Sequence, residues 1–249
     1  MSPLAVQLYS VREQAAVDRR AVLRRIAEMG YGAVEPYDAH LDPDGLREEL
    51  EETGLAVCSV HAPLLDERRA TALAAAAAIG ATTVIVPAAP AEWFAGRQEL
   101  EQAARTIGEV AREAADHGLR LGYHNHWWEL EQRVEGRPAL EVLADLLDPS
   151  VLLEVDLYWA ATGGVDPSGL LARLGERVSH LHVKDGPATQ EGPMTAVGSG
   201  EVPIVDALNT APGAVRIVEL DHCATDMFQA LADSHAYLTG LVAAGRVSS

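Results

Sequence analysis

The fold follows from three consecutive runs of sequence, VLLEVD (residues 151–156), SGLLARL (168–174) and SHLHVK (179–184). In the first and last runs polar residues alternate with apolar ones, which is typical of a β-strand. The middle run carries leucines at helical spacing and follows Asp166 and Pro167, a pair that is common where a helix begins. This part of the chain therefore predicts a β-α-β unit.

The same alternation extends in both directions along the chain. The predicted strands are residues 4–9, 33–36, 55–61, 83–87, 119–124, 151–156, 179–184 and 216–219. The predicted helices are residues 19–29, 45–53, 67–79, 98–117, 139–147, 168–174, 204–208 and 226–244. Strict alternation leaves two architectures, an open doubly wound sheet or a closed (β/α)₈ barrel.

The barrel is favoured. Eight units in 249 residues match its usual size. No Gly-x-Gly-x-x-Gly motif follows the first strand, so the main sign of a dinucleotide fold is missing. No linker or shift in composition divides the chain, and we predict a single α/β domain, a (β/α)₈ TIM barrel over residues 1–249, with a long loop at 186–202.

Charge narrows the range of partners. The chain has 37 Asp and Glu residues against 19 Lys and Arg residues, a formal net charge of −18, and no basic stripe. Nucleic acid is therefore not an expected partner. The first residues lack the pattern of a signal peptide, and no apolar run is long enough to span a bilayer. We expect a cytoplasmic protein without a membrane partner, in which Cys58 and Cys223 are free buried thiols.

Polar residues gather at the ends of the predicted strands. Because strand side chains alternate between faces, Glu154 and Asp156 share one face, and so do His182 and Lys184. Their neighbours are apolar, so these polar sets are expected to point into the barrel, at the end where barrel enzymes have their active sites. Burying such ionisable groups without a counter-charge costs several kcal/mol each. Carboxylates together with a histidine suit one divalent ion, Mn²⁺, Mg²⁺, Co²⁺ or Zn²⁺.

Eight short stretches, in this order, resemble the xylose-isomerase-like barrel superfamily of sugar phosphate isomerases and epimerases. They are VQLYSVR (6–12), GYGAVE (30–35), HAP (61–63), YHNH (123–126), DLYW (156–159), GG (163–164), HVKD (182–185) and VGSG (197–200). The resemblance covers essentially the whole chain. It implies four metal ligands from strands five to eight, in the order Glu, Asp, His, Glu. Asp156, His182 and Glu219 match the last three. At the first position either Glu129, just past the strand, reaches back to the ion or His124 replaces the missing glutamate.

The resemblance also implies an activity, that of a sugar isomerase or epimerase. Such an enzyme moves a proton next to the carbonyl of a keto-sugar or polyol ketone through a metal-stabilised enediolate. Loss of a β-hydroxyl after the same first step would instead make the protein an inosose-type dehydratase. Candidate bases are Glu129, Glu219 and His126. Lys184, the only lysine, would bind a substrate oxygen or hold a carboxylate.

Further residues are expected to contact the substrate. Glu35, His61 and His124 would bind hydroxyl groups, and Trp127 and Trp159 would stack on the C–H face of a sugar ring. Glycines in the 198–200 segment could form a phosphate-binding nest. Few basic residues lie nearby, so a neutral sugar or polyol is favoured.

Three other functions stay open. The departure at strand five allows a non-catalytic barrel that binds a sugar. Metal-dependent phosphodiester hydrolysis is disfavoured by the acidic surface, which repels DNA. A Schiff-base aldolase would use Lys184 as its amine, although neighbouring carboxylates suggest that this side chain is a counter-charge. The resemblance is also compatible with a homo-oligomer.

Overall fold

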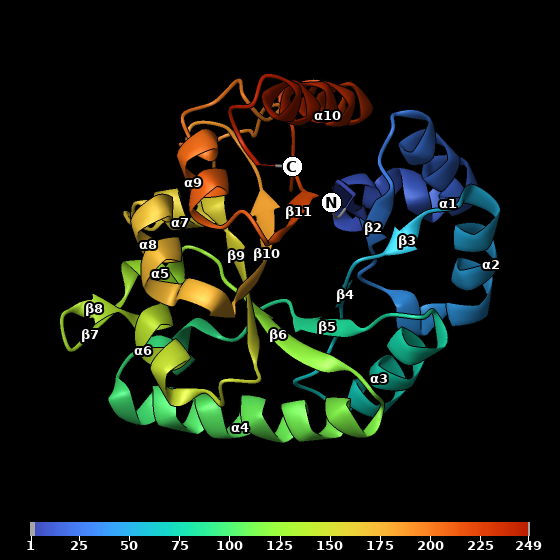
Figure 1. Ribbon diagram of the computed structural model, residues 1–249. Coiled ribbons are helices and arrows are strands. Elements are labelled where there is room, and N and C mark those ends of the chain that lie inside the picture. Colours follow the sequence, from blue (N-terminus) through green and yellow to red (C-terminus); the bar gives the residue numbers. More distant parts are fainter. Residues whose placement is uncertain (1–2, 249) are drawn as a thin grey trace.

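The computed structural model describes residues 3–248, which form a (β/α)₈ barrel (Figure 1). Parallel strands make an inner ring, and helices surround it. The strands of the ring are β1 (Ala5–Gln7), β2 (Ala33–Glu35), β3 (Ala56–Val57), β4 (Val60–His61), β5 (Thr83–Val86), β6 (Arg120–His124), β9 (Leu152–Asp156), β10 (Val178–Val183) and β11 (Val215–Val218). The predicted fold is confirmed.

The third predicted strand, residues 55–61, is divided into β3 and β4. β3 pairs with β2 and β4 pairs with β5, so the chain changes partner between them. The break falls at Cys58 and Ser59. There the Ser59 hydroxyl turns into the ring and donates a 2.5 Å hydrogen bond to Glu35 Oε1. The nine strands of the ring therefore fill eight barrel positions, one of them shared by β3 and β4.

The helices outnumber those predicted. They are α1 (Arg12–Glu28), α2 (Pro43–Thr53), α3 (Arg69–Ala78), α4 (Arg97–Asp116), α5 (Trp128–Glu131), α6 (Ala139–Leu146), α7 (Leu157–Thr162), α8 (Pro167–Leu174), α9 (Ile204–Thr210) and α10 (Met227–Ala243). Three elements were not predicted from the sequence pattern: α5, α7 and the β7–β8 hairpin (Arg133–Val134 and Arg137–Pro138). α7 begins directly after β9 because the Asp156 carboxylate caps it, accepting a 2.8 Å hydrogen bond from Trp159 N.

The inside of the ring is built in levels. The lowest level is apolar and consists of Ala5, Ala33 and Ile217, with Cys58 and Val215 packed against them. Two residues further along the same strands, Gln7, Glu35 and Glu219 are buried. Side chains on one face of a strand recur every second residue, so these polar groups lie directly above the apolar level. The inside of the ring is thus apolar at this level and polar towards the carboxyl end of the barrel.

Three smaller expectations concern loops, thiols and membrane helices. The long loop after β10 is present, and Asp185 at its start forms an isolated bridge with Thr195. Cys58 and Cys223 are free, but both are half-buried rather than fully buried. Among residues 3–248, no helix combines the length and the apolar composition needed to cross a bilayer.

Candidate metal centre

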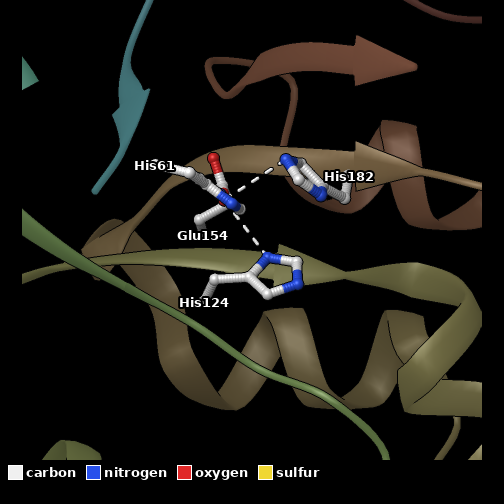
Figure 2. A group of neighbouring side chains, drawn as sticks. All are labelled: His61, His124, Glu154 and His182. Atoms are coloured by element: carbon white, nitrogen blue, oxygen red, sulfur yellow. Dashed lines mark hydrogen bonds and ion pairs between the residues drawn. The ribbon is translucent and has the colours of Figure 1, made fainter. Parts of the chain in front are cut away.

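The register of the strands gathers ionisable side chains into two groups of four inside the ring. The lower group is His61, His124, Glu154 and His182 (Figure 2), and the upper group is His124, Asp156, His182 and Glu219. Within each group the potential ligand atoms lie within 4.8 Å of one another, and every member is buried. Glu154, Asp156 and His182 point into the ring, as the alternation predicted.

Glu154 is the centre of the lower group. Its Oε2 lies 2.5 Å from His61 Nε2, 3.1 Å from His124 Nδ1 and 3.3 Å from His182 Nε2 (Figure 2). His182 Nε2 also lies 2.7 Å from Glu35 Oε2. Three imidazole rings are therefore held by two carboxylates at the level just above the apolar floor.

The upper group lies nearer the carboxyl end of the barrel, because its carboxylate from β9 is Asp156, two residues after Glu154. His182 Nδ1 is 2.6 Å from Glu219 Oε2, and His124 Nε2 is 3.9 Å from Asp156 Oδ2. Asp156 Oδ2 also lies 3.0 Å from Lys184 Nζ. The contacts of His182 Nδ1 and Asp156 Oδ2 are short, but they lack the alignment of hydrogen bonds.

The donor atoms of the upper group fit a divalent ion. Two imidazole nitrogens and two carboxylates converge at short range, and the ring nitrogens of His124 and His182 that face this point are not used by the lower group. A mixed nitrogen and carboxylate set suits Zn²⁺, Co²⁺ or Mn²⁺. The buried cluster can therefore bind a metal, and its donor atoms do not single out which one.

Lys184 supplies positive charge beside the upper group. Its Nζ lies 3.0 Å from Asp156 Oδ2, 2.7 Å from Glu219 Oε2 and 2.8 Å from Asp221 Oδ2. Burial alone would lower the pKa of Lys184, but these carboxylates hold that pKa well above its usual value. Burial would likewise raise the pKa of Glu219, but Lys184 and His182 hold it well below the usual range. Lys184 is therefore charged.

Glu129, one of the two residues expected to complete the metal site, lies outside both groups. Its Oε1 accepts a 2.8 Å hydrogen bond from Tyr123 OH, and its Oε2 accepts a 2.9 Å hydrogen bond from His126 N. Burial raises the pKa of Glu129 to about 8. Tyr123 precedes His124 in β6 and so faces the opposite side of the strand. The strand-five position in both groups is occupied by His124.

A cavity of about 490 Å³ borders the upper group. The ionisable side chains of the centre that line it are His61, His124, His126, Lys184, Glu219 and Asp221. Tyr9 and Tyr37 also line it, and their rings pack edge to face with centroids 5.4 Å apart. The remaining basic residue of the lining, Arg68, is paired with Asp66 at 2.6 Å. The cavity thus offers aromatic surface and carboxylates, and both of its cations are already engaged.

The structure divides the predicted substrate contacts. His61 and His124 line the cavity, whereas Glu35, Trp127 and Trp159 do not. Glu35 is fully buried at the level of the lower group. The two tryptophan rings pack together with centroids 4.8 Å apart, and Lys184 Nζ lies 5.4 Å from the Trp159 centroid. These tryptophans therefore pack beside the centre.

His126, a predicted base, lies between the cavity and the tryptophans. Its ring stacks on Trp128 with centroids 4.3 Å apart. Burial, reinforced by the charge of Lys184, lowers the pKa of His126 to about 3. The buried Nδ1 has no hydrogen-bond partner among the described residues. The imidazole is therefore neutral at neutral pH.

The Asp185 carboxylate fills an anion site in the loop after β10. Its Oδ1 accepts hydrogen bonds from Gly186 N at 2.9 Å and Val202 N at 3.1 Å. Its Oδ2 accepts from Gly198 N at 2.8 Å and Gly200 N at 3.0 Å. The glycine nest anticipated as a phosphate site already holds a side chain of the protein.

Several members of the centre were given no role from the sequence alone. Glu154 and Asp221 lie two residues from Asp156 and Glu219, so strand alternation places them on the same inward faces. Gln7 could be found in the same way, because it is the last residue of β1 and shares a face with Ala5; it is buried. No local pattern marks Asp185 as the occupant of the nest.

Comparison with known proteins identifies the family. The family model described as "Xylose isomerase-like TIM barrel" matches residues 23–220. An inosose dehydratase of Mesomycoplasma hyopneumoniae is 32% identical over 89 residues, which are 35% of this chain and 29% of that protein. The chain therefore aligns with less than a third of this curated relative.

Two solved structures share the fold. A sugar phosphate isomerase/epimerase from Parabacteroides distasonis superposes with a TM-score of 0.81 at 22% identity, over 96% of this chain and 94% of that chain. A probable 3-DHS dehydratase from Bacillus anthracis superposes with a TM-score of 0.73 at 14% identity, over 95% of this chain and 98% of that chain. At these identities the similarity establishes the barrel alone.

Proposed function

The chain belongs to the xylose isomerase-like TIM barrel family, and on that basis we propose that it is an enzyme, a divalent-metal-dependent isomerase or epimerase of a keto-sugar or polyol ketone. The observation that carries the proposal is the upper group. His124, Asp156, His182 and Glu219 bring their donor atoms within 4.8 Å of one another. Two of the four also line the cavity at the carboxyl end of the barrel, where barrel enzymes work.

In this proposal His124 completes the metal site in place of Glu129. His124 lies in the upper group, whereas both Glu129 oxygens are already hydrogen-bonded elsewhere. A divalent ion bound there would polarise a carbonyl and stabilise the negative charge that develops on its oxygen. The other requirements of the reaction fall to the chain's own side chains.

Glu219 is the proposed proton acceptor. It lines the cavity, and Lys184 Nζ holds its Oε2 at 2.7 Å, which fixes the carboxylate in one orientation. The three N–H groups of Lys184 are taken by carboxylates, so its role is to hold them, and neutral His126 could accept a hydrogen bond from a substrate hydroxyl. Returning the proton to the same carbon from the other face gives epimerisation, and delivering it to the neighbouring carbon gives isomerisation.

The substrate is proposed to be unphosphorylated. In barrels, phosphate commonly binds to backbone N–H groups of the loops after strands seven and eight. Here four N–H groups of one such loop are taken by Asp185. The two cations of the cavity, Lys184 and Arg68, are paired with carboxylates. A neutral polyol suits this lining, and Tyr9 and Tyr37 can pack against its C–H groups.

Dehydration is the second candidate, because an inosose dehydratase is among the curated relatives. It begins with the same removal of a proton and ends with loss of a β-hydroxyl. The two reactions are separated by incubating the protein with keto-sugars and inososes in D₂O. Deuterium incorporation with an isomeric product supports the isomerase or epimerase, and an absorbing enone product supports the dehydratase. Sugar binding without any exchange supports the non-catalytic barrel.

The metal requirement is tested by elemental mass spectrometry of protein purified without chelator. About one equivalent of Mn, Mg, Co or Zn is expected, and the Asp156→Ala variant should lose it. Asp145→Ala is the control, because Asp145 is exposed and pairs only with Arg137. No metal in the native protein, even after dialysis against Mn²⁺, would refute the proposal.

A further inference from the structure

His124 and His182 belong to both groups. Each ring faces the lower group with one nitrogen and the upper group with the other. His182 Nε2 and His124 Nδ1 face the carboxylates of the lower group. His182 Nδ1 and His124 Nε2 face the carboxylates of the upper group. A neutral imidazole carries one proton and one lone pair. The position of the proton therefore decides which group can bind a metal.

A series of hydrogen bonds determines that Nε2 of His182 carries a proton. The backbone N–H of Tyr9 can only donate, and it donates to Gln7 Oε1 at 3.1 Å. This sets the orientation of the Gln7 amide, so that Gln7 Nε2 donates to Glu35 Oε2 at 2.8 Å. Ser59 Oγ donates to Glu35 Oε1 at 2.5 Å.

The same hydrogen bonds define the role of Glu35. Both of its oxygens accept hydrogen bonds, so the carboxylate acts only as an acceptor and carries no proton. The nitrogen at 2.7 Å from it, His182 Nε2, must be the donor. His182 Nδ1, which lies 2.6 Å from Glu219 Oε2, is then the ring nitrogen that can offer its lone pair to a metal ion once its proton is lost.

We infer that Glu35 is a positioning residue, which holds a proton on His182 Nε2 and so leaves Nδ1 as the nitrogen that faces the metal position. Glu154 acts in the same way on His124, whose Nδ1 lies 3.1 Å from Glu154 Oε2. The inference rests on the proposed metal site, and it assigns the lower group a different task. The residue types of the lower group could form a second metal site, but its histidine nitrogens donate hydrogen bonds to carboxylates. The protein therefore binds one ion and not two.

Carboxylates that hold a metal-ligating histidine in this way are worth roughly 10–100-fold in metal affinity. The test compares Glu35→Leu, which removes the acceptor, with Glu35→Gln, which keeps an acceptor oxygen but removes the charge. Glu141→Gln is the matched control. Glu141 is also a buried carboxylate, but it lies in α6 and pairs with Arg173 at 2.8 Å, away from both groups.

Two measurements are made on each protein. The dissociation constant for Mn²⁺ is obtained by competition with a chelator, and the number of bound ions by elemental analysis. In the metal-free protein, ¹⁵N NMR of the histidine side chains reports whether Nε2 of His182 is protonated. The assignment of that resonance comes from a His182→Gln variant. Circular dichroism checks that each variant is folded.

The native protein is expected to bind one ion and to carry a proton on His182 Nε2. Glu35→Leu should weaken Mn²⁺ binding by about 10–100-fold, Glu35→Gln should weaken it less, and Glu141→Gln should leave it unchanged. Two bound ions, an unprotonated His182 Nε2, or unaltered affinity in folded Glu35→Leu would overturn the inference. If the native protein binds no Mn²⁺, the proposed function fails instead. The NMR result still tests whether Nε2 is protonated in that case.

Discussion

Replacing Lys184 by methionine should destabilise the metal-free protein by about 3–5 kcal/mol. Lys184 is 1% exposed and lies within 3.0 Å of three carboxylates, those of Asp156, Glu219 and Asp221. Methionine keeps an unbranched apolar stem but removes the charge. Removing one partner of a buried ion pair costs about 3–5 kcal/mol, because the other charge stays buried and uncompensated. For a domain of this size the melting temperature then falls by roughly 6–20 °C.

The assay is thermal denaturation followed by circular dichroism, with chelator and with Mn²⁺. An ion at 100 times its dissociation constant adds about 2.7 kcal/mol of stability. Because the Lys184→Met variant has more unbalanced negative charge at the metal position, Mn²⁺ should raise its melting temperature more than that of the native protein. Arg97→Met is the control. Arg97 is exposed, its pairs with Glu101 and Glu135 are 3.1 and 3.3 Å long, and such pairs are worth about 0–1 kcal/mol.

The outcome that refutes this reasoning is a metal-free Lys184→Met protein that melts within about 2 °C of the native one. A loss equal to that of Arg97→Met would have the same meaning. Either result would show that the carboxylates around Lys184 do not need its charge, for instance because protons neutralise them.

Three further predictions concern other parts of the site. His124→Ala should lose the bound ion and Glu129→Gln should retain it, as measured by elemental analysis; the reverse result would return Glu129 to the metal site. Burial raises the pKa of Glu129 to about 8 in the folded protein, from about 4.5 for an ordinary glutamate. Ionisation therefore favours unfolding, and native stability should decline by up to about 5 kcal/mol between pH 4.5 and 8. Glu129→Gln should lack this part of the decline in melts across that range, and an identical pH profile would contradict the raised pKa. Asp185→Asn should lower stability by about 1–3 kcal/mol, because its amide cannot accept all four N–H groups; an unchanged urea midpoint would count against the filled nest.

Much of the barrel could be predicted from local sequence. The period-two alternation around Glu154, Asp156 and His182 correctly assigned these side chains to the inside of the ring, because the direction of a strand side chain depends only on its place in the strand. The division of residues 55–61 into β3 and β4 was not predictable in this way. It depends on the strand changing its partner from β2 to β5, which is a contact between distant parts of the chain.

The sequence by itself determined the alternation of strands and helices, the inward face of each strand, and the Asp, His and Glu that reach the carboxyl end of the barrel. Only the tertiary structure decided which of these side chains meet. It brought His124 rather than Glu129 close to Asp156, His182 and Glu219, placed Glu35 beneath His182, and filled the glycine nest with Asp185. The physical reason is that the direction of a side chain is local, whereas its height in the barrel and its neighbours depend on the register between strands far apart in the chain.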